Sequence, residues 1–186
     1  KIPLIGLHNI RNATAAVAVS WIIGISKGII KKGLNEFKGV HRRFNQIFEF
    51  RGVKFFDDYA HHPSEIKEVL NGVKDVYKEE SIICIFQPHR ISRLKDLKKE
   101  FTFSFKKADQ VILCPIYSAG EKIKLGFNYY NFAQNIGKNS KVKIFLVKDQ
   151  LSLAKFIKQN IYGKKIVIGM GAGSISNWIK DLPNLI

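Results

Sequence analysis

The 186-residue chain has only two cysteines and no long apolar run. Each cysteine, Cys84 and Cys114, lies inside a short apolar stretch typical of a buried strand. We therefore interpret both as buried, reduced thiols of a cytoplasmic protein, and not as a disulfide or a metal site. No uninterrupted apolar stretch approaches the roughly 18 residues of a membrane-spanning helix. The first residues lead directly into a polar motif, so we expect a soluble chain without a signal peptide.

Acidic residues and arginines are also scarce. The chain has 15 Asp and Glu against 31 Lys and Arg, a net charge of +16, which usually suggests nucleic acid or an anionic membrane as partner. Here the excess is nearly all lysine, spread through every segment, so we expect neither nucleic acid nor membrane as partner. Four arginines form two close pairs, Arg42/Arg43 and Arg90/Arg93, in predicted loops. Because guanidinium binds carboxylate or phosphate through two parallel bonds, both loops are predicted to bind anions.

Residues 1–44 differ in character from the rest of the chain. An alanine-rich run at 13–19 predicts a helix with Asn9 as its N-cap, and a second helix is expected over residues 26–37, before Gly39. Two helices with one apolar face cannot form a core alone. We therefore expect this segment to be the tail of a preceding domain, so that the chain begins inside a longer protein.

From residue 46 onward the pattern is that of an α/β domain. Alternating apolar residues predict a hairpin with Arg51 and Gly52 in its turn. Continuous apolar strands, separated by helical crossovers, then predict a parallel sheet covered on both faces. The strands are expected at 81–86, 111–116, 142–147 and 165–169, and the helices from 63, over 94–105, 129–136 and 151–159, and from 174. Residues 45–186 are thus predicted to form a Rossmann-like, mostly parallel sheet with an antiparallel edge strand.

The richest functional signal follows the hairpin, in residues 57–62 (Asp-Asp-Tyr-Ala-His-His). Ligands of α/β proteins bind beyond the carboxyl ends of parallel strands, where this segment is expected to lie. Its carboxylates could bind a ribose or a metal, and its imidazoles could position a substrate or coordinate a cation. The alternative is a solvated loop in which one aspartate caps the next helix.

Two further loops carry weaker signals. Residues 87–93 (Gln-Pro-His-Arg-Ile-Ser-Arg) place two arginines near a helix start that Ser92 could cap, which suits an anionic ligand, although the charges could be incidental. Residues 169–174 form a glycine-rich turn that suggests phosphate. Because no further strand with an acidic residue follows, close packing of a helix on a strand is the better interpretation. All five histidines lie between His8 and His89, so we expect several to be functional, although one such as His41 could be structural.

Taken together, these motifs resemble the Mur ligases. The resemblance extends over the whole chain, and its motifs occur in the family's order: residues 6–13, 39–44, 57–63, 86–93, 117–121 and 171–173. It implies that residues 1–44 are the C-terminal tail of a central ATP-binding domain and residues 45–186 a complete C-terminal domain. The family's P-loop, magnesium-binding residues and uridine site are absent from this sequence. The resemblance therefore implies that the chain alone is inactive and that the ligands of Mg²⁺ lie in the missing central domain.

The same resemblance implies an activity and a role for particular residues. The implied reaction is the ATP-dependent joining of L-alanine to the muramoyl carboxylate of UDP-N-acetylmuramate through an acyl phosphate, in peptidoglycan synthesis. Asn9 and Asn12 would lie against the adenine and Asp58 would hold the ribose. Arg43 would reach the ATP phosphates. The amino-acid end of the site would consist of Tyr59, His61, His89, Arg90 and Arg93, and the catalytic set of Arg43, His61, Arg90 and Arg93. Ile91 departs from the aromatic residue common in the family and offers no ring for stacking.

Three other interpretations compete with this one. The nearest is a murein tripeptide ligase, whose acid-histidine motif is similar. A non-catalytic Rossmann module that binds a nucleotide or anion is the second, and a nucleic-acid-binding protein is the third.

Overall fold

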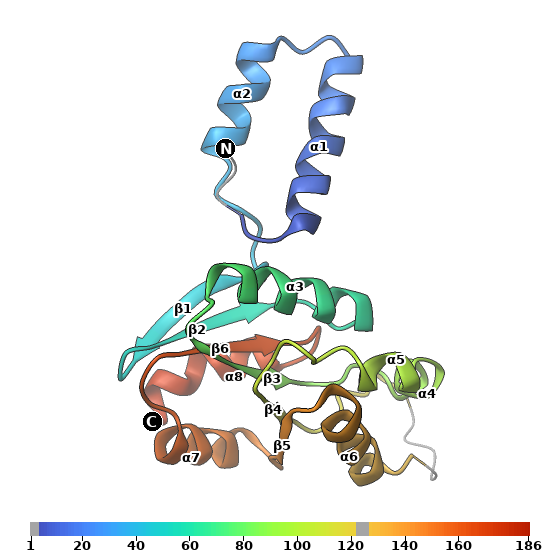
Figure 1. Cartoon of the computed structure of the whole chain (residues 1–186), viewed down its shortest axis with the longest axis vertical. Coiled ribbons are helices and arrows are strands. Elements are labelled where there is room, and N and C mark those ends of the chain that lie inside the picture. The colour runs from blue at the N-terminus through green and yellow to red at the C-terminus, as the bar shows by residue number, and fades with distance from the viewer. Residues whose placement is uncertain (1–3, 122–126) are drawn as a thin grey trace.

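The structure is a computed structural model that describes residues 4–121 and 127–186, and it consists of a helical hairpin standing on an α/β body (Figure 1). The strands are β1 (Asn45–Phe50), β2 (Val53–Asp58), β3 (Ser81–Phe86), β4 (Gln110–Leu113), β5 (Lys143–Leu146) and β6 (Lys165–Met170). The helices are α1 (Leu7–Ile22), α2 (Lys27–Glu36), α3 (Pro63–Val76), α4 (Ile91–Asp96), α5 (Lys98–Thr102), α6 (Tyr129–Ser140), α7 (Gln150–Asn160) and α8 (Ile175–Asp181), followed by a 3₁₀ turn (Leu182–Asn184).

The six strands form one sheet in the order β1-β2-β6-β3-β4-β5. Only β1 runs antiparallel to its neighbour, and the other pairings are parallel. The predicted fold class is therefore confirmed. Asp58 at the end of β2 and Phe86 at the end of β3 both pair with Met170 of β6, so these three strands end at the same level. The loops that follow β2, β3 and β6 consequently all leave the sheet at the carboxyl ends of its parallel strands.

The edge hairpin turns as predicted. Arg51 and Gly52 have φ angles of 50° and 75°. Two successive positive φ angles give the type of turn whose twist matches that of paired antiparallel strands. The register shifts between Gln46 and Phe48, so β1 carries a bulge.

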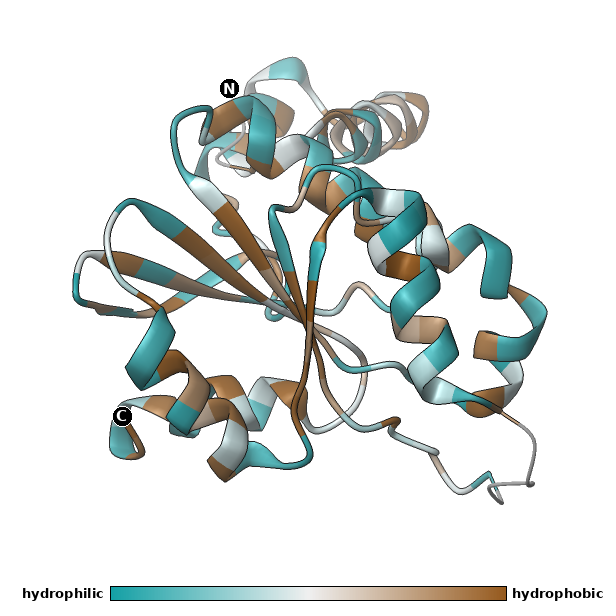
Figure 2. Ribbon diagram, turned by 60° about the horizontal axis from the view of Figure 1, so that its bottom comes forward, coloured by the Kyte–Doolittle hydropathy of each residue, from teal (hydrophilic) through white to brown (hydrophobic). Residues whose placement is uncertain are grey.

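Helices cover both faces of the sheet (Figure 2), and an apolar core lies on each face. One includes residues of α3, α5 and α6 and the fully buried rings of Phe86, Phe101 and Phe132, and the other includes residues of α7 and α8. Each buried phenylalanine contributes about 1.5–3 kcal/mol through removal of its ring from water. Cys84 and Cys114 are free and fully buried in these layers, as predicted, and burial raises the pKa of both thiols.

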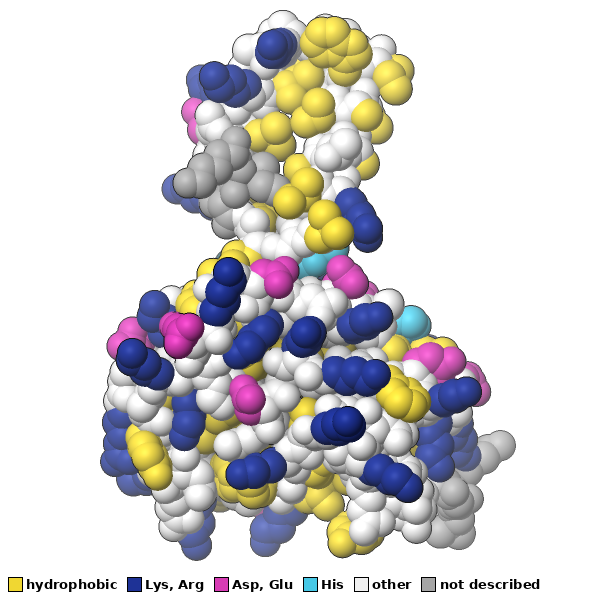
Figure 3. All heavy atoms as spheres, viewed as in Figure 1, with side chains coloured by type: hydrophobic (Ala, Val, Ile, Leu, Met, Phe, Trp, Pro, Cys, Tyr) yellow, Lys and Arg dark blue, Asp and Glu magenta, His cyan; other side chains and the backbone are white. Residues whose placement is uncertain are grey.

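The α1–α2 hairpin extends away from the sheet and contains no buried residue (Figure 1). Apolar side chains gather on the face of the hairpin that Figure 3 shows. Val19, Trp21 and Ile22 of α1 are 59%, 63% and 80% exposed. The hairpin meets the body at α3, where a Cβ added to Gly72 would lie 2.8 Å from the Cα of Gly6. The absence of a side chain at Gly72 therefore permits this approach. The assignment of residues 1–44 to a preceding domain stays a prediction.

Two expectations about the helices are wrong. The first helix begins at Leu7 with Gly6 (φ 90°) at its N-cap position, and the side-chain amide of Asn9 instead donates to the carbonyl of Ile5 at 2.7 Å. The helix expected over 94–105 is divided into α4 and α5, because Leu97 leaves helical geometry (φ −112°, ψ 24°). Within the described ranges, no helix has the length and apolar character needed to cross a membrane.

Candidate active site

Four rings lie in a row across the ends of β2, β3 and β4. The ring centroids of Tyr59 and His61 are 5.2 Å apart, those of His61 and His89 5.8 Å, and those of His89 and Tyr117 5.4 Å. The backbone holds the last pair in place, because the N–H of Tyr117 donates to the carbonyl of Pro88 and the N–H of Arg90 donates to the carbonyl of Tyr117, each at 2.8 Å. The sequence places these rings on three separate loops, and the sheet brings them together at the carboxyl ends of its parallel strands.

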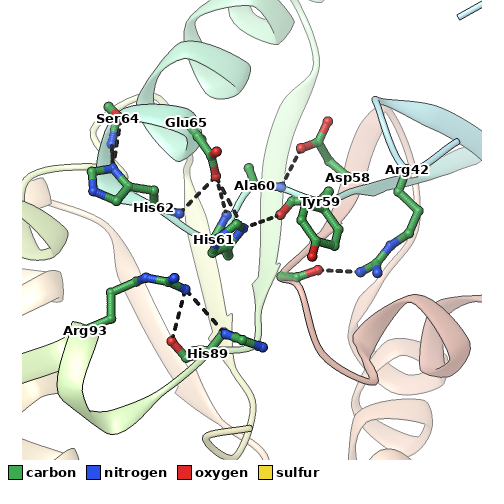
Figure 4. Close-up of polar contacts among 11 residues, drawn as sticks. Arg42, Asp58, Tyr59, Ala60, His61, His62, Ser64, Glu65, His89 and Arg93 are labelled. Carbon is green, nitrogen blue, oxygen red and sulfur yellow. Dashed lines mark hydrogen bonds and ion pairs between the residues drawn. The ribbon is translucent and has the colours of Figure 1, made fainter. Parts of the chain in front are cut away.

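Arg93 of the second arginine pair contacts His89, one of the two histidines in the middle of this row. Arg93 donates from one Nη to Nδ1 and to the carbonyl oxygen of His89, both at 3.3 Å (Figure 4). Burial, the positive charge of Arg93 and the neighbouring His61 lower the pKa of His89, so this imidazole is uncharged at neutral pH. Arg90 begins α4 with a positive φ of 69° and is exposed. Its guanidinium is therefore free to turn toward a ligand.

The start of α4 is held by a carboxylate from another loop. Glu121 accepts hydrogen bonds from the N–H of Ser92 at 3.1 Å and from its hydroxyl at 2.5 Å. These two bonds lower the pKa of Glu121. The expectation that Ser92 caps the helix is wrong, because Arg90 occupies the N-cap position and Ser92 donates to Glu121 instead. Glu121 thus fixes the helix that carries Arg93, a role that only the tertiary structure reveals.

The two adjacent aspartates point to different environments. Asp58 is 2% exposed, and its two carboxylate oxygens accept the N–H groups of Ala60 and Phe44, each at 2.8 Å. Burial raises the pKa of Asp58 to about 6, although both hydrogen bonds and Arg43 act in the opposite direction. Asp58 therefore holds two backbone segments in place, the linker at Phe44 and the loop at Ala60. Each oxygen can accept a second bond, so a contact with ribose stays a prediction.

Asp57 lies on the other face of β2, since successive strand residues alternate in direction. It is 1% exposed, accepts a hydrogen bond from the hydroxyl of Ser176 at 2.6 Å, and lies 3.6 Å from Nε of Arg42. The Arg42 guanidinium also donates to the carbonyl of Gly171 and stacks over the Tyr59 ring, 4.6 Å from its centroid. Of the first arginine pair, Arg42 thus pairs with a carboxylate of the protein itself, which corrects its interpretation as an anion-binding residue.

The glycine-rich turn after β6 is required by packing. A Cβ added to Gly169 would lie 2.4 Å from the side chain of Ile179, and one added to Gly171 would lie 2.7 Å from the carbonyl oxygen of Gln87. At Gly173 the closest atom, at 2.5 Å, belongs to the Tyr117 ring. The interpretation of this motif as close packing is therefore confirmed.

A separate pocket of about 470 Å³ lies between the hairpin and the linker that follows it. Asn9, Asn12 and Arg43 line this pocket, so the three residues predicted to contact adenine and phosphate come together. His8 also lines it, and the pKa of His8 is lowered by burial and by Arg43, against the effect of Glu68. The remaining wall is mainly apolar, formed by Leu4, Ala13, Ala16, Gly33, Leu34, Phe37 and Val40. The pocket thus combines apolar surface with amide groups and a cation.

The described residues contain no group of three or more His, Cys, Asp or Glu side chains that could hold a metal ion. The site residues predicted from the sequence form two groups, one lining the pocket and one in or beside the row of rings. Asp58 lies between them in the chain and bonds to Phe44, the residue after Arg43. Which of these residues contact a ligand stays a prediction.

Comparison with known proteins identifies related chains. Residues 42–173 match a family model described as "Mur ligase, glutamate ligase domain". A UDP-N-acetylmuramate–L-alanine ligase of Pelagibacter ubique is 72% identical over 186 residues, which are 100% of this chain and 40% of that protein. The ligase of the same name from Bartonella tribocorum is 40% identical over 183 residues, or 98% of this chain and 38% of that protein. The chain thus spans about two fifths of the length of these relatives.

Solved structures agree with the sequence matches. The UDP-N-acetylmuramate-alanine ligase MurC of Thermotoga maritima superimposes with a TM-score of 0.79 at 28% identity, over 98% of this chain and 38% of that one. A murein peptide ligase of Psychrobacter arcticus gives a TM-score of 0.72 at 22% identity, over 100% of this chain and 38% of that one. This second likeness concerns the fold alone.

Proposed function

Because this chain belongs to the Mur ligase family, we propose that it is the C-terminal part of an ATP-dependent UDP-N-acetylmuramate–L-alanine ligase. The observation that carries the proposal is the 72% identity to such a ligase over every residue of this chain. The enzyme joins L-alanine to the muramoyl carboxylate of UDP-N-acetylmuramate in cytoplasmic peptidoglycan synthesis. Residues 1–44 would be the end of its central domain and residues 45–186 its C-terminal domain.

The chain would contribute only part of the catalytic machinery. It spans 40% of the length of the relative at 72% identity, and its sequence contains no P-loop. We therefore propose that the chain alone neither hydrolyses ATP nor forms the amide. As the family resemblance implies, the ligands of Mg²⁺ would come from the central domain of the longer protein.

The pocket beside the hairpin suits the nucleotide. Its apolar wall fits the faces of an adenine, and the amides of Asn9 and Asn12 match the hydrogen-bonding edge of that base. Arg43 would extend from the same pocket to the phosphates, for which guanidinium is well suited. Asp58 would hold the ribose hydroxyls. ATP supplies the phosphoryl group that activates the muramoyl carboxylate.

The row of rings suits the amino acid. Arg93 lies against His89, and Arg90 begins the same helix, so two cations are available to bind the alanine carboxylate. Tyr59, His61 and His89 would surround the small side chain and the amine. Negative charge accumulates on the acyl phosphate during amine attack, and fixed cations nearby stabilise it. Closure of the C-terminal domain over the central one would bring these groups to the reacting atoms.

The test is phosphate release by the full-length protein. We expect release to require ATP, UDP-N-acetylmuramate and L-alanine together. Release with a murein tripeptide in place of alanine would instead identify a tripeptide ligase, and ATP binding without any release would identify a non-catalytic module.

Substitution of the arginines tests the amino-acid end of the site. We expect Arg90→Ala and Arg93→Ala to raise the alanine KM roughly 10- to 1,000-fold, because each removes a charge-assisted bond to the carboxylate. Arg51→Ala is the matched control, since Arg51 lies in the turn of the edge hairpin and donates to the carbonyl of Lys158 in α7. Unchanged alanine kinetics in both site variants would refute the carboxylate-binding role.

A further inference from the structure

We propose that His61 is the general base that removes a proton from the ammonium group of the incoming amino acid, and that Glu65 is its positioning residue. The proposal rests on the proposed function and deepens it. An amine attacks only when its nitrogen has a free electron pair, whereas an amino acid carries a protonated amine at neutral pH. Some group near the amine must therefore accept a proton. The site offers three histidines, and their hydrogen bonds distinguish them.

Nδ1 of His62 is already engaged in capping helix α3. Its Nδ1 accepts the N–H of Ser64 at 3.4 Å and lies 2.9 Å from the Ser64 hydroxyl, at the N-cap position of α3. A backbone N–H can only donate, so this nitrogen must be the unprotonated one. His62 therefore uses its free electron pair to cap a helix.

His89 is occupied by an arginine. A guanidinium has donors and no acceptor, so Nδ1 of His89 must accept from Arg93. Since the pKa of His89 is lowered by burial and by Arg93, the ring is neutral and its proton lies on Nε2. The one free electron pair of His89 thus points at Arg93 and away from any substrate.

His61 has the opposite tautomer. Its Nδ1 lies 2.9 Å from the carbonyl oxygen of Tyr59 and 3.4 Å from Oε2 of Glu65 (Figure 4). Both partners are acceptors, so Nδ1 carries a proton and Nε2 of the neutral ring has the free electron pair. Within the described part of the chain, Nε2 has no hydrogen-bond partner, and it is not one of the fully buried unpaired atoms. It is therefore open to a ligand in the row of rings.

Glu65 is held so that its charge faces this ring. Its Oε2 accepts the N–H groups of His61 at 3.0 Å and of His62 at 3.1 Å. Burial alone would raise the pKa of Glu65, but these bonds and the nearby His61 outweigh it, and the pKa is lowered. Glu65 is therefore ionised at neutral pH. A carboxylate at Nδ1 stabilises the imidazolium that forms when Nε2 takes up a proton.

Other groups also face His61. Glu65 comes from α3, and His89, with Arg93 beyond it, comes from the loop after β3. Tyr59 lies on the same segment as His61, and the Arg42 guanidinium lies over the Tyr59 ring. Of these groups, only Glu65 is a carboxylate in direct contact with the ring.

The step is balanced without any further reactant. The ammonium group transfers one proton to Nε2 of His61, and the nitrogen pair then forms a C–N bond to the acyl phosphate carbon. The tetrahedral species expels phosphate with the electron pair of its C–O bond, and the nitrogen loses a second proton to the departing phosphate. His61 returns its proton to solvent. No electron transfer occurs.

Hydroxylamine provides the decisive probe, because it is largely uncharged at neutral pH and needs no base. In the full-length protein with ATP and UDP-N-acetylmuramate, we expect His61→Gln to lower kcat/KM for alanine about 10²- to 10⁴-fold while hydroxamate formation changes only a few-fold. The alanine defect should diminish as the pH rises and the amino acid loses its proton in solution.

The possible results separate the two proposals. A wild-type protein that releases no phosphate with alanine overturns the proposed function itself. If wild type is active, equal loss of alanine and hydroxylamine turnover in His61→Gln overturns the base assignment, as does retained alanine turnover or a defect that persists at high pH.

Glu65→Gln tests the positioning role. Glutamine can still accept the N–H groups of His61 and His62 but carries no charge. We expect the acidic limb of the kcat/KM profile for alanine to move to lower pH by a few tenths to about 0.7 of a pH unit, because the imidazolium loses its carboxylate partner. His62→Asn, which keeps an N-cap side chain, is the control and should leave the limb in place. An unmoved limb in Glu65→Gln would overturn the positioning role.

Discussion

Removal of Arg42 should destabilise the protein strongly, because it leaves a buried carboxylate without its cation. Asp57 is 1% exposed and has the Ser176 hydroxyl and the Arg42 guanidinium as its polar contacts among the described residues. Loss of one partner of a buried ion pair costs about 3–5 kcal/mol. The Arg42 side chain is 25% exposed and the pair is 3.6 Å apart, which favours the lower end of that range. Loss of the contact with the Tyr59 ring adds about 0.5–1 kcal/mol.

We therefore expect Arg42→Ala to lower the free energy of unfolding of the 186-residue chain by about 3–4 kcal/mol. Urea titration followed by circular dichroism measures this value, with an unchanged m-value indicating a two-state comparison. The double variant Arg42→Ala with Asp57→Asn should be at least about 1 kcal/mol more stable than Arg42→Ala alone, since it removes the unpaired charge. Arg51→Ala, which removes an exposed guanidinium, should cost less than about 1 kcal/mol.

Two results would refute this reasoning. One is a decrease in the free energy of unfolding of less than about 1 kcal/mol in Arg42→Ala, which would mean that solvent replaces the guanidinium at little cost. The other is a double variant no more stable than the single one. In that case the destabilisation would come from the lost bond to Gly171 and not from the carboxylate.

Three further expectations concern the site and its supports. Burial raises the pKa of Asp58 to about 6, so the stability that this carboxyl contributes is present below about pH 4 and is lost as the pH rises through 6. A carboxyl NMR titration of the folded chain should show a midpoint near 6, and a midpoint near 4 would contradict this expectation. Gly169→Ala should cost about 1–3 kcal/mol by overpacking against Ile179, and a companion Ile179→Ala should restore part of it in a double-mutant cycle. Glu121→Ala should accelerate hydrogen exchange of the Ser92 amide, whereas unchanged exchange would show that Glu121 does not hold α4.

The order of motifs and the period of the apolar residues determined much of this protein in advance. Continuous apolar runs predicted parallel strands, because only a sheet covered on both faces buries every side chain of a strand. The polar segments 57–62 and 87–93 identified the edge that carries the site, since loops after parallel strands leave at the same end. The resemblance to the Mur ligases rested on the same segments, and the family model that matches residues 42–173 confirmed this resemblance.

Other features depended on contacts between residues far apart in the sequence. Adjacent Asp57 and Asp58 look equivalent in the sequence, but the alternation of a strand sends them to opposite faces with different partners. Ser92 looks like a helix cap until Glu121, 29 positions away, supplies the carboxylate that it bonds. The same limit applies to the histidines. Composition marks a histidine as reactive, but which ring nitrogen keeps its electron pair is decided by the neighbour that folding places beside it.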